Sequence, residues 1–405
     1  MSWEAVKLGD VLRLRNGYAF KSTDYADDGI PLIRISDING GIVSTKRAVK
    51  IPEGKVVSGY FVDEGDILIA MSGATTGKYG IYKAKESVLQ NQRVGNFRIT
   101  DSDRLDKKYL IYIIEGIKPE IEKKAYGGAQ PNISSKMIEE IEIKLPPLPE
   151  QHRIVAKIEE LFRELDAGVE SLKKAKEQLK TYRQAVLKAA FEGKLTGDKI
   201  RFNVIESGEI MDTINNGYTP KANKMNSSGD IPFIKVYNLT FDGSLDFSYR
   251  PTFISSETHK KELKRSQIYP GDVLINIVGP PLGKVSIVTN LYKEWNTNQA
   301  VVLLRPNEKI VSKYLSYQLQ SPQVVSWLTA TSQATAGQFN VRVSTCRIIP
   351  LKVCSVEEQD YLVNEIESRL SVCDNMEQTI EYELKQSESL RQSILKRAFE
   401  GRLVN

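Results

Sequence analysis

The chain has 405 residues, of which 41% are hydrophobic and 26% charged, as expected for a globular protein with room for two to four domains. Its net charge of +5 is spread along the sequence, so contact with nucleic acid must come from local basic patches rather than a polybasic tail. Three cysteines without a CxxC spacing and only two histidines argue against a disulfide framework, a zinc site and histidine-based catalysis.

The sequence also argues against a membrane or secreted protein. It has no apolar run near the roughly 18 residues that a membrane span needs. Its first residues lack the basic-then-apolar layout of a signal peptide. We therefore expect a cytoplasmic protein.

Residues 1–145 are predicted to form a mixed α/β domain. Short apolar strands bounded by turn residues are expected at 30–35, 66–71 and 94–99. A helix is expected at 107–123, because apolar residues recur there at helical spacing. Pro119 should kink that helix or detach its last turn.

A long helix follows, and three prolines at 146, 147 and 149 favour its start at Glu150. Apolar residues then recur every seven residues from Ile158 to Val186, the pattern of a coiled-coil seam. Small residues in the companion column, such as Gly168, should let a partner helix approach closely. Gly193 is the expected stop, which gives roughly 60 Å of helix.

Residues 200–350 repeat the features of the first domain in the same order. Asn-Gly-Tyr occurs at 16–18 and 216–218, and Gly-Asp is followed by an apolar run at both 65–69 and 271–275. The intervening loops differ in length and sequence. Such a pattern favours two copies of one scaffold that present different binding surfaces.

The segment 358–403 repeats 150–195 at a constant offset of 208, with 16 of 46 positions identical. We interpret this as an internal duplication, in which each long helix is the simplest partner for the other. Parallel and antiparallel pairing both remain open, and antiparallel pairing is attractive because it relates the halves by a pseudo-two-fold axis. The predicted helix-pairing residues are Ile158, Leu161, Leu165, Leu172, Leu179, Tyr182, Val186, Ile366, Leu370, Cys373, Met376, Ile380, Leu390 and Ile394.

The two helical copies differ in charge, because residues 146–199 carry +2 and residues 351–405 carry −4. The second copy also places Cys373 and Ser387 in its seam. We therefore expect the paired helices to offer non-equivalent surfaces to otherwise equivalent partners.

Polar, basic and aromatic side chains beside the strand ends are the candidate nucleic-acid contacts. Asn and Gln can bond adenine edges, and Arg or Lys guanine edges. For any single residue the favoured alternative is that it caps a turn or bonds to backbone. The candidates are Tyr18, Lys21, Arg34, Thr75, Thr76, Lys78, Tyr79, Asn91, Gln92, Arg93, Gln130, Asn132, Tyr218, Lys221, Lys235, Asn276, Lys284, Asn298, Gln299, Gln338 and Asn340.

The stretch 72–79 superficially resembles a phosphate-binding loop. It has three residues instead of four between Gly73 and Gly77, and Tyr79 stands where Ser or Thr is required. A strand-connecting turn that presents Lys78 is therefore predicted. We find no dinucleotide fingerprint, and we expect no catalytic or metal-binding residues.

The helix entry at 145–151 and the closing motif Leu187–Leu195 resemble the central conserved region of type I restriction–modification specificity subunits. The second copy resembles their distal conserved region, and Ser72–Lys78 with Asn91–Gln92 resembles the framework of their target recognition domains. The resemblance implies an α+β protein with two α/β recognition domains and two long helices that pair as an antiparallel coiled coil. The implied segments are 1–145, 146–197, 198–350 and 351–405.

The resemblance further implies a non-catalytic subunit that binds double-stranded DNA, each recognition domain reading one half of a bipartite target. The helices would set the spacing and dock two methyltransferase subunits, which restriction subunits would join. S-adenosylmethionine, ATP and Mg²⁺ would belong to those partners, with no cofactor on this chain. Two other classes stay open: a coiled-coil scaffold without sequence-specific DNA binding, and an enzyme whose site no motif reveals.

Overall fold

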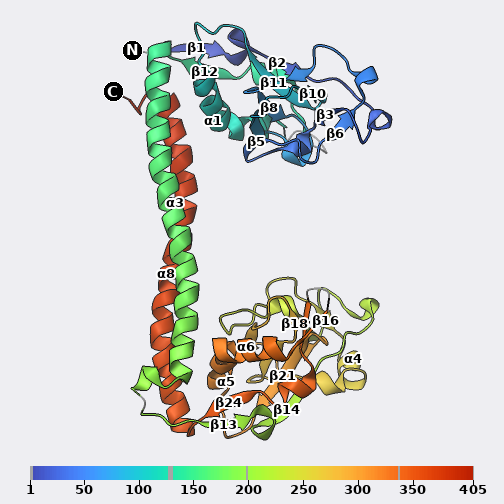
Figure 1. The fold of residues 1–405 in the computed structure, drawn as a ribbon, viewed down its shortest axis with the longest axis vertical. Coiled ribbons are helices and arrows are strands. Elements are labelled where there is room, and N and C mark those ends of the chain that lie inside the picture. The colour runs from blue at the N-terminus through green and yellow to red at the C-terminus, as the bar shows by residue number, and fades with distance from the viewer. Residues whose placement is uncertain (1–2, 126–130, 198, 336–337, 405) are drawn as a thin grey trace. The chain divides into compact units, whose positions relative to one another are not determined.

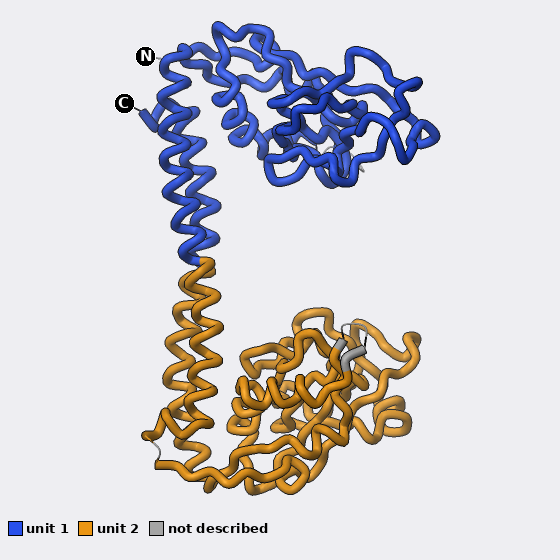
Figure 2. The backbone as a smooth tube through the Cα atoms, in the orientation of Figure 1, with its two compact units in different colours: residues 1–172, 382–405 blue, residues 173–381 orange. Residues whose placement is uncertain are grey.

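The computed structural model describes residues 3–125, 131–197, 199–335 and 338–404. It forms two compact units (Figure 2). Unit 1 comprises Met1–Leu172 with Tyr382–Asn405, and unit 2 comprises Lys173–Glu381. The boundary crosses both long helices, so each unit contains part of each. The four segments expected from the sequence follow sequence motifs, whereas the two units follow spatial compactness, so the four segments stay a prediction.

Unit 1 is built on a six-stranded sheet with the order β2-β11-β8-β9-β5-β4 and a four-stranded sheet with the order β6-β3-β10-β7. Strands β1 and β12 form a separate antiparallel pair. The elements are β1 (Glu4–Lys7), β2 (Leu12–Asn16), β3 (Ile30–Ile33), β4 (Ile38–Asn39), β5 (Gly41–Val43), β6 (Val49–Ile51), β7 (Phe61–Val62), β8 (Ile67–Ala70), β9 (Tyr79–Tyr82), β10 (Val88–Gln90), β11 (Val94–Ile99), α1 (Lys107–Ala125), α2 (Ser135–Glu139) and β12 (Glu142–Leu145).

The six-stranded sheet of unit 1 is buried on both faces. Ile67 and Ile69 of β8 pack in the cluster that contains α1, whereas Leu68 and Ala70 pack in the cluster that contains the second sheet. Burial on both faces explains why the sequence of β8 is a continuous run of apolar residues instead of an alternation of apolar and polar ones. Helix α1 continues through Pro119 instead of ending there.

Unit 2 repeats this plan. Its central antiparallel order β14-β21-β17-β19 corresponds to β2-β11-β8-β9. Two helices, α5 and α6, take the place of α1, and a small sheet β18-β23-β22 is added. The elements are β13 (Asn203–Glu206), β14 (Met211–Asn216), β15 (Ile231–Ile234), β16 (Phe253–Ile254), α4 (Ser256–Lys261), β17 (Val273–Asn276), β18 (Val278–Gly279), β19 (Val285–Ile287), β20 (Asn296–Thr297), β21 (Val301–Pro306), α5 (Ser312–Gln320), α6 (Pro322–Thr331), β22 (Gln333–Thr335), β23 (Gln338–Asn340), α7 (Val343–Cys346) and β24 (Pro350–Val353).

The long helices are α3 (Leu148–Phe191) and α8 (Val356–Phe399), drawn side by side in Figure 1. Helix α3 begins two residues before the predicted Glu150, because a proline in the first turn has no intrahelical N–H partner to lose. The predicted stops are confirmed, since Gly193 and Gly401 have φ angles of 86° and 73° beyond the helix ends. Within the described chain, no helix is both long enough and apolar enough to cross a bilayer.

The predicted antiparallel pairing is confirmed by two ion pairs that the duplication relates, because the earlier residue of α3 pairs with the later residue of α8. Arg391 of α8 pairs with Asp166 of α3 in unit 1. Arg183 of α3 pairs with Asp374 of α8 in unit 2, and these positions differ from the first pair by 208. In unit 1 the Arg391 guanidinium also lies 4.1 Å from the centre of the Phe162 ring.

Most predicted seam residues are buried or half-buried, but three are not. Tyr182, Met376 and Leu390 are 46%, 53% and 51% exposed. Their part in helix pairing stays a prediction. The buried members are Ile158, Val186, Ile366, Cys373, Ile380 and Ile394, and the half-buried ones are Leu161, Leu165, Leu172, Leu179 and Leu370.

The duplicated motifs also fix the helices to the sheets. In unit 1, buried Gln151 at the start of α3 accepts a 2.9 Å hydrogen bond from the Asp106 N–H and donates one to the Arg104 carbonyl. Phe399 at the end of α8 packs edge-on against Tyr109 of α1. Unit 2 repeats both contacts, with Gln359 bonded to Val311 N–H and Phe191 against Tyr314. The sheet-containing part of each unit, which we call its body, is therefore held by the start of one long helix and the end of the other.

Candidate nucleic-acid interface

Five loops of unit 1 meet at one end of its sheets, and we call them loop cluster 1. They are joined by backbone hydrogen bonds: Gln92 N–H donates to Tyr18 O at 3.0 Å, Asn91 N–H to Ile33 O at 3.0 Å, Met71 N–H to Arg93 O at 3.0 Å and Ile133 N–H to Met71 O at 2.9 Å. The loops are residues 17–21, 34–37, 71–78, 91–93 and 131–133. The sequence candidates of this domain are thus brought together, although they are spread over more than a hundred residues.

Unit 2 has the corresponding loop cluster 2, formed by residues 217–221, 235–244, 276–284, 298–300 and 339–341. Ile277 N–H donates to Ala300 O at 3.0 Å, and Val341 N–H donates to Ile277 O at 2.9 Å, as the equivalent residues do in unit 1. The same backbone hydrogen bonds therefore hold part of both clusters. The side chains and loop lengths differ, and unit 2 adds the small sheet β18-β23-β22.

Most candidates are solvent-accessible in these clusters. In loop cluster 1, Tyr18 is 40% exposed, and Lys21, Lys78, Arg93 and Asn132 are also exposed. In loop cluster 2, Tyr218 is 65% exposed beside exposed Lys221 and Gln299. Half-buried candidates are Arg34, Thr75, Gln92, Lys235, Lys284, Asn298 and Asn340. The clusters thus present rings, cations and amides together, which suits contact with bases and phosphates.

Several candidates instead hold the framework, which corrects their assignment as contacts. Asn276 is 2% exposed, and its amide bonds to the carbonyls of Val278 and Pro281. The buried Thr76 hydroxyl donates to the Gly73 carbonyl at 2.7 Å. The reason in both cases is that a tight turn leaves backbone groups that a short polar side chain can satisfy.

The asparagines that recur in the two halves, Asn91 and Asn298, each stabilise the equivalent turn of their own unit. Buried Asn91 accepts a hydrogen bond from the Arg93 N–H at 3.3 Å, and Asn298 accepts one from the Ala300 N–H at 3.3 Å. Their recurrence therefore reflects turn geometry rather than shared base reading. Tyr79 likewise leaves the candidate set, because its hydroxyl donates to Glu115 of α1 at 3.2 Å and burial raises its pKa.

Loop cluster 1 contains polar atoms that lack partners. The Oγ of Ser72, the Oγ1 of Thr75 and the Oε1 of Gln92 are inaccessible to solvent and have no hydrogen-bond partner among the described residues. Buried polar groups without partners are rare in folded proteins and often mark a place where a ligand completes the bonding. These atoms point to the 72–75 and 92–93 turns as the part of the cluster most ready for a polar ligand.

Loop cluster 2 contains a ring that the sequence candidates did not include. Phe241 at the tip of the 240–244 turn is 53% exposed, and the Lys284 ammonium lies 5.6 Å from its ring centre. Thr240 and Ser244 both bond to the Asp242 carboxylate and hold the turn. Burial alone would raise the pKa of Asp242, but these hydrogen bonds lower it overall. The Asp-Gly turn signal after the strand at 231–234 was available in the sequence.

Two candidates fall outside what can be described: Gln130 is not among the described residues, and only the backbone of Gln338 is. In the described part of the chain, no group of three or more His, Cys, Asp or Glu residues is placed to hold a metal ion.

Comparison with known proteins supplies the context of these clusters. The chain is 30% identical to the specificity subunit of the type I restriction enzyme EcoBI from Escherichia coli, over 100% of this chain and 86% of that protein. It is 24% identical to the EcoKI specificity subunit of E. coli strain K12, over 99% of this chain and 89% of that protein.

Two solved structures share the fold. One, from a study of complex assembly and conformational transition of the type I R-M system, has a TM-score of 0.69 at 18% identity, with 99% of this chain and 98% of that chain covered. The other, the HsdS subunit from Thermoanaerobacter tengcongensis, has a TM-score of 0.53 at 18% identity, with 99% and 97% covered. At this identity the likeness shows the fold alone.

The strongest assignment comes from the family comparison, because it spans both units. The model of the type I restriction modification DNA specificity domain matches residues 1–179 and 200–386. The chain therefore belongs to the type I restriction–modification DNA specificity family.

Proposed function

We propose that loop clusters 1 and 2 each read one half of a bipartite double-stranded DNA target. As a specificity subunit the chain is non-catalytic and supplies sequence recognition to a type I restriction–modification enzyme. The observation that carries the assignment of the clusters is their duplicated backbone framework, which bears different exposed side chains in the two units. A split DNA site that is not a repeat requires that combination.

The side chains divide into two groups by chemistry. Exposed Lys21, Lys78 and Lys221 are suited to phosphates, which position a protein on DNA without reading its sequence. Exposed Arg93 and Gln299 are of residue types that make bidentate contacts with base edges in the major groove. Rings at Tyr18, Tyr218 and Phe241 can stack on bases or enter a base step.

The paired helices α3 and α8 complete the proposal. They set the separation of the two half-sites and dock two methyltransferase subunits, which restriction subunits join. S-adenosylmethionine, ATP and Mg²⁺ act in those partners. The cytoplasm, where DNA and these subunits meet, is the proposed location.

A domain exchange tests this function. Residues 1–145 are replaced with the corresponding segment of the EcoBI relative, and the methylome of cells that contain the methyltransferase partner is sequenced. We expect one half of the methylated sequence to change and the other half to stay. Replacement of residues 200–350 instead should change only the other half, which makes the two exchanges controls for each other.

The outcomes separate the proposal from its rivals. A methylated sequence that is unaffected by either exchange would identify the chain as a scaffold without sequence-specific DNA binding. Methylation or cleavage of DNA by the purified chain without partners would instead reveal an enzyme.

A further inference from the structure

Residues 255–267 of unit 2, which include helix α4 (Figure 1), differ in charge from the equivalent stretch of unit 1. The strands on either side pair in the same way in both units, which aligns residues 255–267 with residues 52–61. We call residues 255–267 the basic segment, because they carry four Lys or Arg and two Glu side chains, whereas residues 52–61 carry one Lys and one Glu. That one lysine, Lys55, is paired with Asp24 at 2.8 Å.

The carboxylates of the basic segment are both engaged by lysines. Glu257 pairs with Lys261 at 2.9 Å. Glu262 pairs with Lys224, which lies outside the segment. The other three cations are exposed, and no acidic side chain of the described residues lies within ion-pair distance of them. Cations without counterions on a surface attract an anionic partner. These three are Lys260, Lys264 and Arg265.

Buried hydrogen bonds attach the basic segment to the strand that leads into loop cluster 2. The Asn296 amide of β20 donates to the Leu263 carbonyl at 3.1 Å, and its oxygen accepts from the Ser266 hydroxyl at 2.7 Å. The Nδ1 of His259 lies 3.1 Å from the same amide nitrogen. Asn296 is fully buried and stands two residues before Asn298 of loop cluster 2. The cations are therefore carried on a fixed support beside that cluster.

Unit 1 shows the same proximity without the charge. Tyr60, the equivalent of Ser266, has its ring centre 5.6 Å from that of Tyr18 in loop cluster 1. Leu89 stands at the position of Asn296, so the polar attachment belongs to unit 2. The two cations that directly precede Ser266 thus extend the surface of loop cluster 2 in a way that loop cluster 1 lacks.

We propose that the basic segment binds phosphates of the DNA that flanks the half-site read by unit 2. This inference rests on the proposed function and adds to it a contact that reads no sequence. Phosphate contacts position a protein on DNA and raise affinity through the release of counterions. Because the lysine of residues 52–61 is paired within the fold, this stretch of unit 1 makes no such contact. The protein therefore holds the DNA on the two sides of its target unequally.

The length of the flanking DNA tests this inequality. The full chain is assembled with methyltransferase subunits, and its affinity is measured by fluorescence anisotropy for targets shortened on one side at a time. The domain exchange described above identifies which side belongs to unit 2. We expect shortening on that side to cost the parent roughly tenfold more affinity than shortening on the other side, since several phosphate contacts are lost.

Removal of the three free cations should abolish the difference between the two sides. The variant carries Lys260→Gln, Lys264→Gln and Arg265→Gln. The slope of log affinity against log salt should also become shallower by about 2–3, because each phosphate contact in B-DNA contributes about 0.9. All three side chains are exposed, so the fold should be unaffected.

Two further variants separate charge from position. A charge-preserving variant should keep the dependence on flank length, because phosphates are held by charge; it carries Lys260→Arg, Lys264→Arg and Arg265→Lys. A control variant removes three exposed cations of unit 2 outside the basic segment and loop cluster 2, and it should behave like the parent. It carries Lys199→Gln, Arg201→Gln and Lys309→Gln.

The remaining outcomes are distinct. If the triple glutamine variant keeps the flank dependence and the salt slope of the parent, the inference fails, while selective binding by the parent leaves the proposed function intact. If that variant no longer assembles with methyltransferase, the basic segment binds protein rather than DNA, which also overturns the inference. A parent complex without preference for its target would contradict the proposed function itself.

Discussion

The exposed ring of Phe241 lies on a turn that side-chain hydrogen bonds hold together. Its turn is held by the Asp242 carboxylate, and a lysine ammonium faces the ring. A rigid turn holds its shape when it meets DNA, so the ring can stack on a base or enter a base step without further ordering of the backbone.

Phe241→Ala should therefore weaken binding of the specific DNA target by about 1–3 kcal/mol. The loss should be confined to sequences with the half-site read by unit 2. Leu291→Ala serves as the control, because Leu291 is 69% exposed but lies outside loop cluster 2. The affinities of both variants are measured by fluorescence anisotropy, with the intact DNA target and with targets in which one half-site is altered. Equal losses in the two variants would show that exposure alone, and not position, explains the effect.

A second residue-scale prediction concerns His259, which is fully buried with its Nε2 3.6 Å from Glu294 Oε2. Burial lowers the pKa of His259, while Glu294 acts in the opposite direction. The unfolded chain consequently binds a proton more readily than the folded protein. Stability should therefore be lost as the pH falls below about 6.5, the ordinary histidine value.

Denaturant unfolding at roughly pH 7.5 and pH 5.5 measures this loss. His259→Asn, which keeps an oxygen acceptor for the Asn296 amide, should lose less stability on acidification than the parent. An undiminished loss in His259→Asn would assign the acid sensitivity to other groups.

At the scale of elements, helix α1 meets the end of α8 at a glycine. A Cβ added at Gly116 would lie 2.6 Å from the Phe399 ring, which Tyr109 contacts as well. Alanine at this position should therefore destabilise the protein by about 1–3 kcal/mol, although alanine is the better helix former. Gly168→Ala, in open space on α3, should instead stabilise the protein by about 0.5–1 kcal/mol.

Chemical denaturation of the two glycine variants checks the contrast. Phe399→Leu combined with Gly116→Ala should recover part of the loss, because the smaller side chain makes room for the added methyl group. If Gly116→Ala is as stable as Gly168→Ala, the ring is free to move and the junction is looser than the contact indicates.

At the scale of the whole molecule, the duplication made the architecture predictable. A constant offset of 208 between two heptad patterns favoured one helix as the partner of the other, and the ion pairs Arg391–Asp166 and Arg183–Asp374 confirm the antiparallel choice. The strand at 94–99 was predicted with its observed bounds. Long-range pattern carries this information because it depends on many residues at once.

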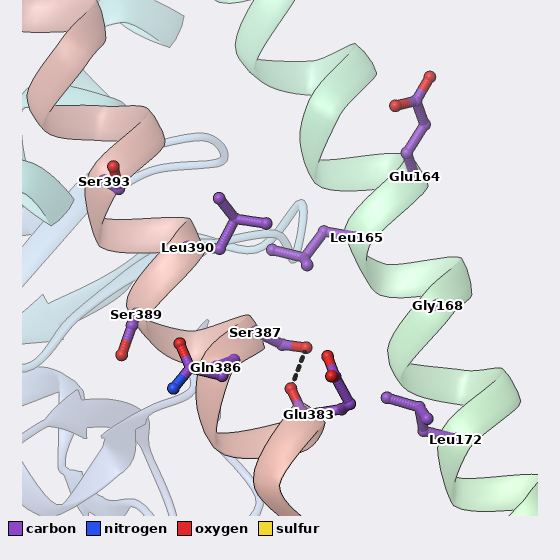
Figure 3. A pocket seen from close by; sticks show the side chains of 10 residues that line it. All are labelled: Glu164, Leu165, Gly168, Leu172, Glu383, Gln386, Ser387, Ser389, Leu390 and Ser393. Carbon is purple, nitrogen blue, oxygen red and sulfur yellow. Dashed lines mark hydrogen bonds between the residues drawn. The ribbon is translucent and has the colours of Figure 1, made fainter. Parts of the chain in front are cut away.

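Local detail was less predictable for a physical reason. Asn91 and Gln92 are neighbours of similar chemistry, yet Asn91 is buried and holds a turn while the Gln92 carbonyl oxygen has no partner among the described residues. The shape of the turn decides between them, and that shape depends on loops far away in the sequence. The open space beside Gly168 (Figure 3), where an added Cβ would meet nothing within 4 Å, was missed likewise, because a small seam residue is compatible with both close contact and an opening.

The arrangement in which each body is held by the start of one helix and the end of the other also governs how the chain is made. Ile394, Leu395 and Ala398 belong to the core of unit 1, so its earliest strands leave the ribosome long before the residues that complete their core. Unit 2 acquires all of its residues first. The core of unit 1 therefore stays incompletely packed until residues 394–398 are translated, and a nonsense mutation before these residues damages strands that were made more than 200 residues earlier.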